Sequence, residues 1–89
     1  MIRYTVSPEA ACASVDDGAV ILHMRTKRYY SLNDTGGAIW SMLEADAPVD
    51  AIVAELVATY EVDAPDAAAA VMTMLGELAA VELVRVEDS

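Results

Sequence analysis

The sequence predicts an α+β fold of winged-helix-like outline, in which a three-stranded antiparallel sheet is followed by three helices. Two observations support this prediction. Short apolar segments separated by turn residues fill the first third of the chain, as expected for small strands. Apolar residues at helical spacing fill the remainder, where Pro48 and Pro65 stand at positions typical of helix starts. Strands first and helices afterwards indicate an α+β architecture.

The length of 89 residues predicts one domain, 1–89. A chain of this size buries about 60–65% of its unfolded surface, and an apolar content of 56% supplies the core. The single cysteine, Cys12, excludes an internal disulfide and is interpreted as a small buried side chain. We expect a cytoplasmic protein without signal peptide or membrane span, because no apolar run approaches 18 residues.

Four segments of the first third have strand character, although the first is either a strand or a loosely attached arm. They are residues 1–7, 10–15, 19–24 and 28–32. Asp16-Asp17-Gly18 provides the turn before the third segment. Residues 25–27 turn the chain so that the fourth returns antiparallel. The last three segments therefore predict a three-stranded meander.

The strand at 28–32 leads directly into the first helix, predicted over residues 35–45. Asn33 and Asp34 offer side-chain oxygens suited to an N-cap. Gly36 and Gly37 in the first turn indicate that another part of the chain approaches closely there.

Two further helices are predicted over residues 48–60 and 65–80. Val71, Leu75 and Leu78 centre the buried face of the third helix. One flank of that face is formed by Ala67, Ala70 and Met74. The other flank is formed by Ala68, Met72 and Ala79. Because we expect only this helix to pack behind the outer strand, we predict a groove between residues 28–32 and the third helix.

No catalytic constellation is recognisable, so the sequence does not predict an enzyme. His23 is the only histidine and is interpreted as a partly exposed strand residue. No His/Cys set has the spacing of a metal site, and Gly36-Gly37 lacks the lysine of a phosphate-binding loop. We expect no cofactor and no metal.

The charge distribution argues against DNA binding, which the winged-helix outline would otherwise favour. The net charge is −10, and residues 33–89 carry Arg85 as their one cation against twelve acids. The third helix has Asp66 and Glu77 but no lysine or arginine, whereas a recognition helix needs cations to neutralise phosphates. We therefore expect no nucleic-acid partner.

An interaction module is the function class that remains. An outer strand presents unpaired backbone groups to which another strand can add, and Tyr29 and Tyr30 offer large contact area. Three of the five cations, Arg25, Lys27 and Arg28, cluster at the preceding turn. They form either a solvated hairpin tip or a patch that attracts an acidic ligand.

These residues resemble the PqqD-like family of peptide-binding domains. The resemblance extends over residues 10–84 and rests on the order of short motifs: Asp-Gly, Tyr-Tyr-Ser-Leu-Asn, Thr-Gly-Gly-Ala-Ile-Trp-Ser-Met-Leu and Val-Asp-Ala-Ile-Val-x-x-Leu. Within the family the chain looks most like the stand-alone leader-binding protein of split lasso-peptide systems. Members often carry glycine before the two tyrosines, where this chain has Lys27.

The resemblance implies a protein that binds the leader segment of a ribosomally made precursor peptide as an added strand. It implies presentation of that peptide to a separate leader peptidase and a cyclase; the alternative is a PqqD-type chaperone serving a radical SAM enzyme. The peptide would lie between the outer strand and the third helix. The residues expected there are Arg28, Tyr29, Tyr30, Ser31, Leu32, Ala67, Ala70, Val71, Met74 and Leu78, with Arg25 and Lys27 steering the ligand by charge.

Overall fold

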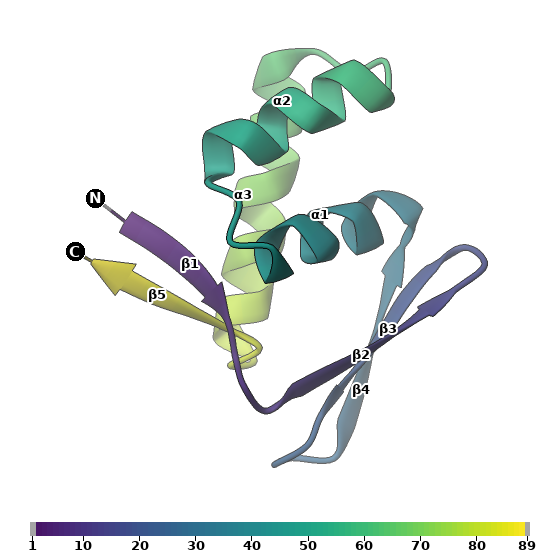
Figure 1. Cartoon of the computed structure of the whole chain (residues 1–89), viewed down its shortest axis with the longest axis vertical. Helices are drawn as coiled ribbons and strands as arrows, with labels where there is room; N and C mark the ends of the chain where they lie inside the picture. The colour runs from purple at the N-terminus through teal and green to yellow at the C-terminus, as the bar shows by residue number, and fades with distance from the viewer. Residues whose placement is uncertain (1, 89) are drawn as a thin grey trace.

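The structure, a computed structural model, describes residues 2–88 and confirms the predicted α+β fold. Five strands and three helices follow one another in the order shown in Figure 1. They are β1 (Ile2–Val6), β2 (Ala10–Val15), β3 (Gly18–His23), β4 (Arg28–Asn33), α1 (Asp34–Glu44), α2 (Val49–Thr59), α3 (Ala64–Ala80) and β5 (Val84–Asp88). The predicted meander and the three helices therefore lie within about two residues of their expected bounds.

The meander is an antiparallel sheet in the order β2-β3-β4, and α1 packs against β3 and β4. Ile21 of β3 is fully buried together with Ile39, Trp40 and Leu43 of α1. The expectation that only the third helix lies behind the outer strand is therefore wrong, because α1 continues directly from β4 and folds back over the sheet.

The face of β3 that packs under α1 carries Ala19, Ile21 and His23. His23 was expected to be partly exposed, but it is only 1% exposed. Its Nδ1 accepts a hydrogen bond of 3.3 Å from the backbone N–H of Arg25, whereas its Nε2 is buried without a hydrogen-bond partner among the described residues.

The contact between α1 and the sheet depends on two glycines. A Cβ on Gly37 would lie 3.3 Å from the carbonyl carbon of Gly18, tighter than ordinary van der Waals contact. Gly18 itself has φ +151° and faces the carbonyl oxygen of Leu32, where a Cβ has no room. The predicted close approach at the first turn of α1 is thus confirmed. The Asn33 cap is confirmed as well, since its Oδ1 accepts the Gly36 N–H at 2.8 Å.

The two remaining helices complete the core. α2 and α3 pack against each other, and Figure 1 shows α3 as the long helix behind α1 and α2. Ile52 and Leu56 of α2 and Val71 and Leu75 of α3 are all buried in this cluster. Among the described residues, no helix combines the length and the apolar character needed to cross a membrane.

A second, two-stranded sheet joins the two ends of the described chain. β1 pairs antiparallel with β5, from Ile2 opposite Asp88 to Val6 opposite Val84. The backbone N–H of Ser7 extends this contact by donating to the carbonyl of Leu83 at 2.9 Å. The first segment is therefore a strand, and its pairing with the closing segment was not predicted.

Both α1 and α3 end in the same type of turn, in which an acidic residue adopts left-handed backbone geometry. After α1, Asp46 has φ +60°; after α3, Glu82 has φ +62°. Backbone N–H groups of residues 46–47 and 82–83 bond back to the last turn of each helix, as in a Schellman motif. An arginine side chain reaches each acid: Arg3 lies 3.4 Å from Asp46 and Arg25 lies 2.7 Å from Glu82.

Candidate functional site

β4 is an outer strand, because within residues 2–88 it pairs only with β3. The direction of its backbone groups follows from the neighbouring strand pair. Beyond the end of β3, the N–H of Met24 donates to the carbonyl of Glu9 at 2.8 Å. Since backbone groups alternate in direction along a strand, the even-numbered residues of β3 bond toward β2 and the odd-numbered ones toward β4.

The odd-numbered residues of β3 lie opposite Arg28, Tyr30 and Leu32. Those three residues therefore direct their N–H and C=O groups into the sheet. Tyr29 and Ser31 direct theirs outward, away from β3. A strand added to β4 would take its hydrogen bonds from these two residues.

The side chains of β4 divide between the two faces of the sheet. Tyr30 and Leu32 are half-buried and pack against the core beneath α1. Tyr29 and Ser31 lie on the opposite face, where the Tyr29 side chain is 72% exposed. An added strand would therefore meet apolar side chains on the helical side and a free tyrosine on the other.

The expected contribution of α3 differs from the arrangement in the structure. Ala67, Val71 and Leu78 are core residues with almost no exposed surface, so their side chains are not available to a ligand. Met74 is half-buried and packs against the same core, while Ala70 is exposed. The helical wheel located the apolar face of α3, but it could not show that this face is already covered.

At the C-terminal end of α3, the other flank of this helix lies near the turn between β3 and β4. Ala79 lines a small hollow of about 140 Å³ together with Glu9, which precedes β2, and Arg25, which lies in the β3–β4 turn. Met72 lies two turns earlier on the same flank and is 47% exposed.

The three cations at the turn are not equivalent. Arg25 binds two carboxylates, with Nε 2.9 Å from Glu9 and Nη2 2.7 Å from Glu82. The Arg25 guanidinium holds the pKa of the Glu82 carboxyl below its ordinary value, chiefly through this hydrogen bond. Lys27 and Arg28 are exposed and form no ion pair within the described residues.

The site contains no recognisable catalytic set. Cys12 was expected to be buried, but it is exposed. The part of its side chain that is covered, together with the Glu44 carboxylate, raises the pKa of its thiol. A raised pKa lowers the thiolate population, so this thiol is a poor nucleophile. Among residues 2–88, no group of three His, Cys, Asp or Glu side chains is arranged to hold a metal ion.

Comparison with known proteins identifies relatives of the chain. The profile of the family described as "Coenzyme PQQ synthesis protein D (PqqD)" matches residues 18–84. The structure "TbiB1 in Complex with the TbiA(beta) Leader Peptide" is 34% identical over 91% of this chain and 94% of that chain, with a TM-score of 0.87. "Lasso peptide synthetase B1 complexed with the leader peptide" is 26% identical over 93% and 98%, with a TM-score of 0.85. No curated protein matches the chain.

The family match covers β3 and β4 of the meander and all three helices. The structural matches cover nearly the full length of both chains compared. The resemblance noted from the sequence motifs is thereby confirmed: the chain belongs to the PqqD family.

Proposed function

We propose that this protein binds the leader segment of a ribosomally made precursor peptide in lasso-peptide biosynthesis. The leader adds as a strand to β4 and is presented to a leader peptidase and a cyclase; the protein itself is not a catalyst. The observation that carries the proposal is the free edge of β4, in a chain whose fold matches two proteins in complex with leader peptides.

The recognition energy is shared between main-chain pairing and side-chain contacts. Tyr29 and Ser31 supply the outward backbone groups that set the strand register. On the helical side, Tyr30 and Leu32 form one wall. We assign the other wall to the exposed flank of α3 at Met72, because Ala79 of the same flank lies beside Arg25 of the β3–β4 turn, whereas Met74 packs against the core.

Charge contributes mainly to the rate of association. Lys27 and Arg28 stand at the open end of β4 and attract acidic leader residues. Arg25, first assigned the same steering role, is largely neutralised by Glu9 and Glu82. It serves instead to hold the turn against α3.

The test is calorimetry with the leader peptide encoded beside this chain, using two matched variants on α3. Met72→Glu should weaken leader binding by at least about tenfold, since it puts an unpaired charge into the contact between leader and α3, from which water is excluded. Its thermal stability should stay unchanged because Met72 is exposed in the free protein. Met74→Glu is the control: it should lower stability, because Met74 packs against the core.

Two results would contradict the proposal. Normal leader binding by a folded Met72→Glu variant would exclude the Met72 flank. Binding of mixed-sequence duplex DNA without any binding of the leader would exclude leader recognition altogether. The family description also names coenzyme PQQ synthesis, so a PqqD-type chaperone is the second candidate. A neighbouring radical SAM enzyme that needs this chain for activity on the peptide would favour it.

A further inference from the structure

The sheet has a second outer strand, β2, on the side opposite β4. Its sequence, Ala-Ala-Cys-Ala-Ser-Val, contains no charged residue and no proline, and five of its six residues are exposed. Exposed edges of natural sheets are commonly protected by charges, prolines or bulges, which prevent unwanted strand addition. None of these features interrupts the pairing of β2 with β3 from Ala10 to Val15.

The same alternation that orients β4 also orients β2. Because Glu9 bonds to Met24, the odd-numbered residues of β2 direct their backbone groups toward β3. Cys12 and Ser14 therefore present their N–H and C=O groups at the free edge, whereas the N–H of Ala10 already donates to the carbonyl of Ser7 at 3.1 Å. The sheet can accept one strand on each side.

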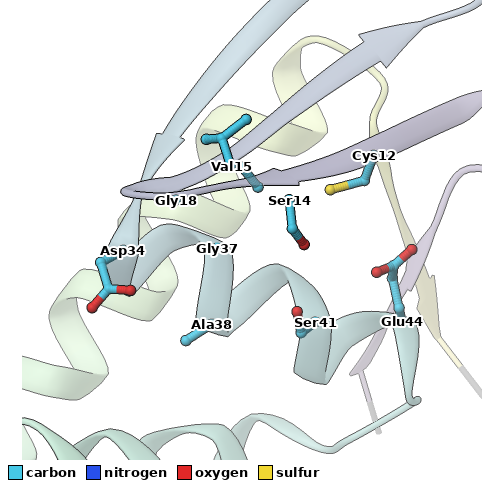
Figure 2. Close-up of a pocket in the computed structure, with 10 residues that line it drawn as sticks. Cys12, Ser14, Val15, Gly18, Asp34, Gly37, Ala38, Ser41 and Glu44 are labelled. Atoms are coloured by element: carbon cyan, nitrogen blue, oxygen red, sulfur yellow. The ribbon is translucent and has the colours of Figure 1, made fainter.

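A hollow lies beside this edge, between β2 and α1, with a volume of about 320 Å³ (Figure 2). It exists because the inward-facing residues of β2, which include Cys12 and Ser14, are small and α1 packs over β3 and β4. Figure 2 shows the side chains of Ser14, Cys12, Ser41 and Glu44 around the opening. A side chain of an added strand that pointed toward α1 would enter this space.

The hollow is suited to a cationic side chain. Asp34 and Glu44 line it from the two ends of α1, and its lining contains no lysine or arginine. Glu44 occupies the last turn of α1, where the helix dipole favours a cation, and that turn has no basic residue. Burial and the Glu44 carboxylate together raise the pKa of the Cys12 thiol, which lines the same hollow.

A second copy of this chain does not fit these requirements. Each copy carries a net charge of −10, and its own β2 would bring neighbouring Asp16 and Asp17 but no cation. A partner with a basic extended segment complements the edge in both hydrogen bonding and charge.

We propose that β2 is the docking edge for the enzyme that processes the bound peptide, which adds an extended segment whose Lys or Arg side chain enters the hollow near Glu44. The inference rests on the proposed leader-binding function. Leader and enzyme would then occupy opposite edges of one sheet, so that neither displaces the other.

The experiment measures two affinities separately, using the leader peptide and the separate leader peptidase of the same pathway as probes. Glu44→Lys should weaken binding of the peptidase by at least about tenfold and leave leader affinity unchanged. Glu61→Lys makes the same charge reversal in the exposed link between α2 and α3 and should leave both affinities unchanged.

Amide hydrogen exchange provides an independent readout of the same contact. Binding of the peptidase should slow exchange at Cys12 and Ser14, while Ala11 and Ala13 are already protected by β3. Ser14→Pro removes one outward N–H without touching the β2–β3 hydrogen bonds and should reduce peptidase binding.

Each outcome separates the two proposals. Normal peptidase binding by Glu44→Lys, with unchanged exchange at Cys12 and Ser14, would overturn the β2 docking edge and leave leader binding intact. A concentration-dependent dimer that Ser14→Pro abolishes would show that a second copy occupies the edge, and would equally overturn the inference. Failure of the wild-type protein to bind the leader would instead remove the proposed function.

Discussion

At the scale of single residues, the unusual feature is left-handed backbone at positions that carry side chains. Lys27, Asp46 and Glu82 all have φ near +60°. Each stands where the chain reverses sharply, at the β3–β4 turn or just after a helix. For a residue with a Cβ, this conformation is less favourable than the right-handed one by about 1–2 kcal/mol, because the Cβ approaches the following carbonyl oxygen. Because none of the three is glycine, the sequence did not predict left-handed backbone at these positions.

Lys27 provides a direct test of this strain. Lys27→Gly should stabilise the fold by roughly 1 kcal/mol, because glycine adopts φ +63° without the steric penalty of a Cβ. The greater freedom of glycine in the unfolded chain offsets only part of this gain. The measurement is the free energy of unfolding in urea. Lys27→Ala is the control, because it removes the charge but keeps the Cβ; its stability should stay close to that of the wild type. Equal stability of the glycine and alanine variants would contradict the interpretation.

At the scale of elements, β4 combines a strand edge with a fixed direction of its hydrogen-bonding groups. Tyr30 and Leu32 bond inward to β3, whereas Tyr29 and Ser31 bond outward. The strand therefore offers a template with one register. A shift of one residue would turn the apolar side chains of an added peptide away from the helical side.

This alternation predicts a pattern of amide protection on leader binding. Hydrogen exchange at Tyr29 and Ser31 should slow markedly, whereas Tyr30 and Leu32, already bonded within the sheet, should change little. The readout is residue-resolved NMR of the free and leader-bound protein. Uniform slowing along all of β4 would indicate general stabilisation and not strand addition. Unchanged exchange at Tyr29 and Ser31 would place the ligand elsewhere.

At the scale of the whole molecule, Arg25 connects parts of the chain that are far apart in sequence. It joins Glu9, before β2, to Glu82, after α3, and so fixes the β3–β4 turn against the end of the helix. This contact sets the spacing between the start of β4 and α3, which are the two walls of the proposed leader site.

The contact should depend on pH in a defined direction. Arg25 lowers the pKa of Glu82 in the folded protein, so the stabilisation is present above the ordinary carboxyl value of 4.5 and is lost as pH falls through the lowered folded value. Arg25→Gln should therefore be less stable than the wild type near neutral pH, and the difference in melting temperature should shrink in acid. Arg28→Gln removes a neighbouring cation that forms no ion pair among residues 2–88, and it should show no such pH-dependent difference. A constant difference for Arg25→Gln at all pH values would contradict the assignment.

Local patterns in the sequence predicted the meander, the Asn33 cap and the three helices, because these depend on residues close together in the chain. Two features were beyond such patterns. Val20 and Leu22 are as apolar as Ala19 and Ile21, so only the packing of α1 decides which face of β3 is buried. For the same reason the sequence could not show that Ala67, Val71 and Leu78 of α3 are covered by the core.

The β1–β5 ladder has a consequence for how the molecule folds. It joins residues at opposite ends of the described chain, whereas the β2–β3 and β3–β4 hairpins and the α2–α3 pair are made by neighbours in sequence. Closing so long a loop has the largest entropic cost of any contact in the fold, and it is repaid only once the helices have already brought the two ends together. The ladder should therefore form last and open first, leaving the sheet and its two outer strands folded while the ends of the chain separate.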